Sequence, residues 1–273
     1  MPPLKVGAVM YDPKVSVIWE IIRDFFDAQG APIDTAFYST YEQQNDGLLS
    51  GAIDIAWNSP LAWVDAQRRS GGGCRAIAMR DTDRDRVSYV VARRQGPVQA
   101  LGDLKGRVIA TGARDSPQAT LIPLGHLRRH GLTPGTDVAV RRFDVLVGKH
   151  GDHVGGERDA LTCLMTGEAA ACAMLDLNWE GWIKDGTIDG NQFRIVAETS
   201  RFDHCVFTVR QDLDPSVEKP WLDALFAMRY DNPAHREMMD LEGLKAWLPG
   251  RTTGFGPLTA AVETERFFAP IPS

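Results

Sequence analysis

The residues with the clearest chemical potential lie where a short apolar strand, expected over residues 107–110, runs into a polar turn and a helix. Asp115 and Ser116 are good helix N-cap residues, Pro117 suits the first helical position, and Gly131 suits the position after the last turn. Such a helix start presents free N–H groups and a partial positive charge. The segment 112–131 therefore predicts an anion site, with an ordinary capped helix as the alternative.

A Gly- and His-rich loop over residues 144–157 supplies further candidates. Four of its side chains have a spacing that metal ligands can use: His150, Asp152, His153 and Glu157. A flexible glycine-rich loop is a poor preformed metal site and no second cluster of ligands is evident, so we expect no metal. No Walker A or GxGxxG pattern appears either, and we expect no cofactor. His153 is instead a candidate ligand contact, the alternative being a histidine on a solvated surface. Arg114 or Lys149 is a candidate for the positive charge that an anion needs.

The elements that must position these residues alternate between strand and helix. Apolar runs predict strands at 4–10, 33–38, 53–57, 75–79, 87–92, 107–110, 137–143, 169–175, 193–198 and 206–210, and helical periodicity separates most of them. This order predicts doubly wound sheets with ligand-contacting loops at the carboxyl ends of the strands.

Several polar or aromatic side chains fall at these strand ends. The first part of the chain places Tyr11, Tyr41, Asn58 and Ser59 at or near such loops. Asp176 follows the apolar run 169–175 directly. Each of them is a candidate ligand contact, with core packing or helix capping as the alternative.

Two polar stretches, 93–101 and 199–203, are expected to carry the chain from one lobe to the other and back. They predict a discontinuous first lobe, residues 1–92 plus 204–273, with a second lobe, residues 93–203, inserted in it.

Composition narrows the function. A net charge of −6 argues against nucleic-acid binding, and no apolar run approaches the length needed to insert in a membrane. The four cysteines show no CxxC spacing. From Met1 onward no export signal is evident, so either a signal peptide was removed or the protein stays in the cytoplasm.

Taken together, the motifs resemble the periplasmic phosphonate/phosphite/phosphate-binding proteins of ABC transporters. The segments that carry the resemblance are Tyr41, GAIDIAWNSPLAWVDA at 51–66, DLKGRVIA at 103–110, DSPQATLIP at 115–123, GDH at 151–153, the small-residue strand at 169–173, and WLPGRTTGF at 247–255. The resemblance implies an α/β, type II periplasmic-binding-protein-like fold, each lobe a doubly wound mixed sheet flanked by helices.

In that family two lobes close on a small oxyanion, and the resemblance implies roles by position. Ser116 and Gln118 would hold the oxyanion, and His153 would be the cleft histidine. Further contacts would come from Tyr41, Asn58 with Ser59, Asp176 (for a ligand amine), and Asp203 or His204. The family's Ser-Thr-Ser run is reduced here to Ser116-Pro117-Gln118, so a carboxylate or another oxyanion stays open as the ligand.

The leading hypothesis is a solute-binding protein that captures a small oxyanion for a membrane permease in the periplasm. The alternative is a cytoplasmic enzyme or ligand sensor on the same fold, since fold alone does not decide function.

Overall fold

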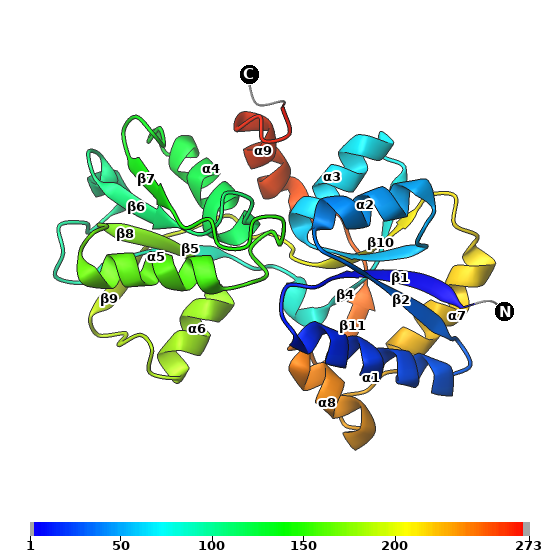
Figure 1. Ribbon diagram of the computed structural model, residues 1–273. Helices are drawn as coiled ribbons and strands as arrows, with labels where there is room; N and C mark the ends of the chain where they lie inside the picture. The colour runs from blue at the N-terminus through cyan, green and yellow to red at the C-terminus, as the bar shows by residue number, and fades with distance from the viewer. Residues whose placement is uncertain (1–2, 270–273) are drawn as a thin grey trace. The chain divides into compact units, whose positions relative to one another are not determined.

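The computed structural model describes residues 3–269, which divide into two compact units (Figure 1). The first unit contains the described residues up to Arg84 together with Asp203–Phe255. The second contains Asp85–Phe202 and the described residues from Gly256 onward. The chain therefore crosses between the units three times.

The first unit is built on a six-stranded sheet with helices on both faces. Its elements are β1 (Leu4–Val9), α1 (Lys14–Ala28), β2 (Ile33–Tyr38), α2 (Tyr41–Ser50), β3 (Ile55–Asn58), α3 (Pro60–Ser70), β4 (Cys74–Arg80), β10 (Val206–Arg210), α7 (Pro215–Phe226), α8 (Pro233–Leu241) and β11 (Trp247–Pro249). The strand order is β11-β4-β10-β3-β1-β2. Helices α1, α7 and α8 enclose an aromatic core that includes Trp57, Phe207 and Trp221, while α2 and α3 pack on the other face.

The second unit is built on a five-stranded sheet. Its elements are β5 (Ser88–Arg93), β6 (Val108–Thr111), a π-helical turn (Pro117–Leu121), α4 (Ile122–Arg129), β7 (Ala139–Arg142), α5 (Gly155–Thr166), β8 (Ala171–Leu175), α6 (Asp176–Lys184), β9 (Phe193–Glu198) and α9 (Gly256–Thr264). Successive residues of β5 point to opposite faces: Val91 packs with α5 and α6, and Val90 packs with α4. Both faces of this sheet are therefore buried.

The two sheets share one topology. The second is ordered β7-β6-β8-β5-β9, and the first five strands of the other unit follow the equivalent order β2-β1-β3-β10-β4. In each, one strand, β5 or β10, runs antiparallel to both of its neighbours. Both sheets are mixed because their other pairs of central strands are parallel. In each unit the antiparallel strand is the first one after the chain crosses over from the other unit.

The unit boundaries differ from the predicted lobes in three places, the smallest difference being Asp203, which was expected in the second lobe and belongs to the first unit. Residues 85–92 were expected in the first lobe, but β5 pairs with β8 and β9 and belongs to the second sheet. The residues from Gly256 were also expected in the first lobe, but α9 packs on α4, where a Cβ on Gly125 would lie 3.1 Å from that of Ala261. Among the described residues, no helix is long and apolar enough to cross a membrane.

A buried histidine on α4 makes the stability of the protein depend on pH. Burial, with the nearby His130 and Arg129, lowers the pKa of His126 to about 4. In the unfolded chain this pKa is about 6.5, so the unfolded state binds more protons between these values. Stability is therefore fully present above about pH 6.5 and falls by up to about 3 kcal/mol as the pH approaches 4. Thermal unfolding across this range should show a flatter profile for His126→Gln, and an unchanged profile would contradict this assignment.

Candidate functional site

In the second unit, the predicted anion site lies at the carboxyl edge of the parallel strands, after β6. Ser116 is almost completely buried, and its Oγ accepts a hydrogen bond from the backbone N–H of Ala119 at 3.2 Å. A hydroxyl that accepts in this way keeps its own proton to donate. The predicted N-cap role of Ser116 is thus confirmed, and the cap leaves a donor available.

The sequence predicted one unbroken helix starting at Ser116, but the structure differs. Its first turn is π-helical, with the N–H of Leu121 donating to the carbonyl of Ser116 at 3.0 Å, and α4 begins only at Ile122. Pro123 explains part of the difference, because it has no N–H to donate to the carbonyl of Ala119. That carbonyl instead accepts from the N–H of Gly112 at 3.3 Å. Single π-helical turns are frequent at functional sites.

The glycine-rich loop folds directly onto this turn. Gln118 donates through Nε2 to the carbonyl of Gly151 at 3.0 Å, and the N–H of Gly148 donates to Asp115 Oδ2 at 2.5 Å. A Cβ on Gly151 would lie only 2.3 Å from Ser116 Oγ, so this position has no room for a side chain. His153, on the same loop, is half-buried and its Nδ1 accepts from the N–H of Gly155 at 3.2 Å.

Sequence reasoning missed two threonines at this turn. Thr111 is the last residue of β6 and Thr120 belongs to the π-helical turn, and both are essentially inaccessible to solvent. Within residues 3–269 neither hydroxyl has a hydrogen-bond partner, and the same holds for Gln118 Oε1. Buried polar groups are normally paired, so unpaired ones mark a place for a ligand or an ordered water. The position of Thr120, four residues after Ser116, was the available signal, since it puts both on one side of a helical turn.

Asp176 and Arg114 lie at the same edge but in different environments. Asp176 is buried at the start of α6, and its carboxylate lies 3.4 Å from Arg86, whose charge opposes the desolvation that raises the pKa of Asp176. Arg114 has an exposed side chain, and its backbone N–H donates to Asp144 Oδ1 at 2.7 Å. Lys149 is the other residue that was predicted to supply a positive charge to the anion, and burial lowers its pKa.

In the first unit, the predicted residues also gather at the carboxyl edge of the sheet. Tyr41 is buried at the start of α2, and Ser59 caps α3 by accepting from the N–H of Ala62 at 3.1 Å. Tyr11 is partly buried against the core. Asn58 lies in a buried amide network: it accepts from Gln44 Nε2 at 2.8 Å and donates to Asn45 Oδ1 at 3.2 Å. Its amide therefore holds the strand end in place.

Asp203 lies where the chain returns to this edge, and the structure adds a partner that the sequence did not suggest. Both carboxylate oxygens of Asp203 accept from Arg251, each at 2.6 Å, and a Cβ on Gly254 would lie 2.1 Å from the same carboxyl group. Arg251 and Gly254 both belong to the WLPGRTTGF segment, which was one of the segments that resembled the family. No role was predicted for Arg251 from the sequence.

His204 contacts a charged network at the same place. Its Nδ1 lies 3.1 Å from Cys205 Sγ and 3.6 Å from Asp83 Oδ1, and its buried Nε2 has no hydrogen-bond partner among the residues described. Within residues 3–269, these three side chains are the group whose donor atoms could meet at one metal ion, rather than the four residues of the 150–157 loop. Arg80 binds both oxygens of Asp83, at 2.7 and 2.8 Å, which disfavours a second cation there.

Solved structures with the same fold are found at low sequence identity. PhnD1 from Prochlorococcus marinus in complex with methylphosphonate has a TM-score of 0.72 at 16% identity, with 96% of this chain and 98% of that chain covered. XAC2383 from Xanthomonas citri bound to ATP has a TM-score of 0.76 at 18% identity, covering 98% and 99%. The periplasmic aliphatic sulphonate binding protein SsuA from Escherichia coli has a TM-score of 0.63 at 13% identity, covering 99% and 89%. The predicted type II periplasmic-binding-protein fold is confirmed.

Similarity in sequence identifies the family. An uncharacterized protein of Haemophilus influenzae is 54% identical over 39 residues, which are 14% of this chain and 55% of that protein's length. The family model described as "ABC transporter, phosphonate, periplasmic substrate-binding protein" matches residues 11–255. Because this match spans most of the sequence and the fold agrees with it, the chain belongs to the phosphonate family of periplasmic substrate-binding proteins of ABC transporters.

Proposed function

We propose that this protein captures a small tetrahedral oxyanion, a phosphonate, phosphite or phosphate, in the periplasm and delivers it to an ABC-transporter permease. The observation that supports this best is the group of buried hydroxyls at the start of the π-helical turn. Ser116 retains a proton to donate, and the Thr111 and Thr120 hydroxyls lack partners among the described residues. Hydroxyl and N–H donors at a helix start are suited to an anion, which has only acceptors to offer.

Two further polar groups suggest that the anion carries an organic substituent with a hydrogen-bond donor. Gln118 Oε1 is a buried acceptor with no partner in the part of the chain that is described, and the Asp176 carboxylate lies at the same edge of the sheet. Acceptors of this kind pair with a ligand that carries a protonated amine or a hydroxyl. In the second unit, His153 is a further proposed contact. The candidates in the first unit are Tyr11, Tyr41, Ser59 and Asp203, the last held by Arg251. Asn58 would act indirectly, through the network that fixes the end of β3.

A thermal-shift screen tests the ligand class. The panel contains methylphosphonate, 2-aminoethylphosphonate, phosphite, phosphate, methanesulfonate and acetate. A ligand at 100 times its Kd is expected to add about 2.7 kcal/mol of stability. We expect the phosphorus oxyanions to stabilise the protein most. Stabilisation by acetate alone, or by no member of the panel, would contradict the proposal, and turnover of a bound compound would point to the enzyme alternative.

Thr120→Val tests the site itself, because valine keeps the shape of threonine and removes only the hydroxyl. We expect the best ligand of the screen to bind about tenfold more weakly, since a hydrogen bond to a charged group contributes about 1.5 kcal/mol or more. The matched control is Thr162→Val on α5, whose exposed hydroxyl donates to the carbonyl of Arg158. Isothermal titration calorimetry of the three proteins decides, and equal affinities would remove Thr120 from the site.

A further inference from the structure

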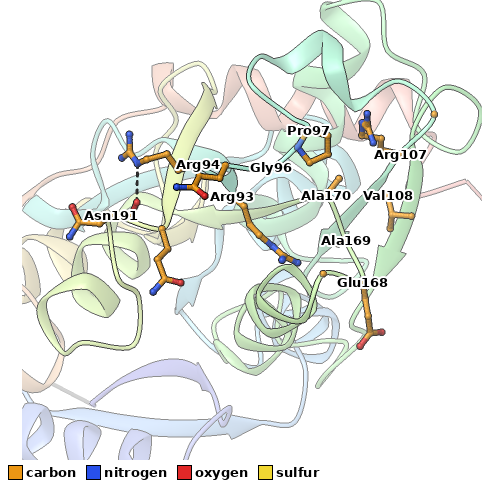
Figure 2. Close-up of a pocket in the computed structure, with 14 residues that line it drawn as sticks. Arg93, Arg94, Gly96, Pro97, Arg107, Val108, Glu168, Ala169, Ala170 and Asn191 are labelled. Carbon is orange, nitrogen blue, oxygen red and sulfur yellow. Dashed lines mark hydrogen bonds between the residues drawn. The ribbon is translucent and has the colours of Figure 1, made fainter.

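We infer that the second unit carries another anion site, at the edge of its sheet opposite the Ser116 turn, which takes a small polyanion. A cavity of about 770 Å³ opens there (Figure 2). It lies where β6 begins at Val108, where residues 169 and 170 lead into β8, and where antiparallel β5 ends at Arg93. Ser116 follows the opposite end of β6, so the two sites share no residue.

The lining of this cavity is positively charged in a protein whose net charge is −6. Three arginines line it: Arg93, Arg94 and Arg107. The carboxylate in the lining, Glu168, accepts from Arg141 at 2.5 Å, and Arg141 lies outside the lining. Glu168 is thus neutralised from elsewhere, and the positive charge of the arginines is left for a ligand.

Two of these guanidinium groups are held in place by one hydrogen bond each, which leaves their other N–H groups to bind a ligand. Arg93 donates through Nε to the carbonyl of Leu164 at 3.1 Å, and Arg107 donates through Nε to that of Asp103 at 2.9 Å. Among the described residues, the terminal nitrogens of both side chains have no hydrogen-bond partner. Since the fork of a guanidinium matches the paired oxygens of a phosphate or carboxylate, each is positioned to bind one.

A glycine makes room for one of the forks. Gly167 has a φ of +84°, and a Cβ there would lie 2.3 Å from Arg93 Nη2. A side chain at residue 167 would therefore displace the guanidinium. In Figure 2, Arg93 extends from β5 toward Glu168, while Arg94 turns away to donate to the carbonyl of Asn191 at 3.0 Å. Arg93 and Arg107 are thus the two arginines available to a ligand.

The rest of the lining indicates which anion fits. The cavity volume is within the usual range for small-molecule sites. The lining contains no aromatic side chain to stack on a nucleobase, and Gln95, Asn191 and Gln192 add amides that can bind oxygen atoms. Arginines on separate segments favour a ligand with at least two oxyanion groups. The site therefore suits a compact polyphosphate or polycarboxylate.

Calorimetric titration of the full chain with tripolyphosphate and, separately, with citrate tests this inference and shows which oxyanion is preferred. We expect one site per chain, and at least about tenfold weaker binding for Arg93→Gln and for Arg107→Gln. Arg23→Gln, an equal charge change on α1 of the first unit, should bind as the parent does. The side chain of Arg107 is exposed, so Arg107→Gln is expected to fold. If Arg93→Gln proves unstable, Arg107→Gln alone tests the inference.

Three results would overturn the inference: no binding of either probe at millimolar concentration, equal weakening by Arg23→Gln, or no effect of Arg107→Gln. The outcome is independent of the proposed transport function. Thr120→Val should leave polyanion binding unchanged, and Arg107→Gln should leave binding of the phosphonate-type ligand unchanged.

Discussion

Replacing Asp83 with alanine is expected to lower the free energy of unfolding by about 3–5 kcal/mol, the usual cost of leaving a buried charge without its partner. Asp83 is 2% exposed and accepts from Arg80 Nε and Nη2 at 2.7 and 2.8 Å. It also accepts from the N–H of Cys205 at 3.2 Å. Asp83 lies just before the chain leaves the first unit and Cys205 lies just after it returns, so this contact joins the two parts of that unit. Urea denaturation of parent and variant measures the difference.

The control is Asp231→Ala, which breaks another Asp–Arg pair with good geometry. Arg229 and Asp231 lie 2.5 Å apart, but both side chains are about 70% exposed. Exposed pairs contribute little to stability because water screens their charges, so this variant should unfold nearly as the parent does. If Asp83→Ala lost no more stability than Asp231→Ala, the buried network would not hold the first unit together.

The same carboxylate makes stability depend on pH in the acid range. Burial would raise the pKa of Asp83, but the charge and hydrogen bonds of Arg80 outweigh it and hold this pKa well below its usual range. A depressed carboxyl pKa stabilises the folded state above about pH 4, and this contribution is lost as the pH falls further. The effect lies below the window in which His126 acts, so the two can be separated.

Replacing Gly151 with alanine is expected to weaken ligand binding about a hundredfold while most of the protein stays folded. The added Cβ would lie 2.3 Å from Ser116 Oγ and 2.8 Å from Gln118 Nε2, so the loop or the π-helical turn must move. Displacing two groups that hydrogen-bond a charged ligand costs about 3 kcal/mol, which corresponds to this loss of affinity. Titration with the ligand identified in the screen provides the measurement.

Gly151 also has a φ of +79°, which strains any other residue, and Gly135→Ala separates the two effects. Gly135 has a φ of +85° in the same unit, but nothing lies within 4 Å of the Cβ it would gain. Its variant should share the strain and keep the affinity. Equal losses of affinity in the two variants would show that contact between the loop and Ser116 does not matter for binding.

The local parts of the fold could be predicted from sequence because they depend on residues close together. Strands expected at 33–38, 193–198 and 206–210 match β2, β9 and β10 residue for residue. The turn at Ser116 was recognisable for the same reason, since capping residues and the helix start lie within a few positions.

The remaining features depend on partners far away in the chain. Whether 88–93 joins one sheet or the other is decided by pairing with β8 and β9, which no periodicity reveals. The pairing of Asp203 with Arg251 spans 48 residues. The unpaired hydroxyls of Thr111 and Thr120 became visible only when the turn was seen folded against the end of β6.

The antiparallel strand in each sheet also sets the order in which the units can be completed during synthesis. In the first unit β10 separates β3 from β4, so the segment 1–84 lacks the strand that joins its two parts until residue 210 has left the ribosome. All five strands of the second sheet lie between residues 88 and 198 and precede β10 in the chain. Long-range pairing is slow because a large loop must close first. The sheet of the second unit can thus be completed before that of the first, although β1 to β4 precede it in the chain.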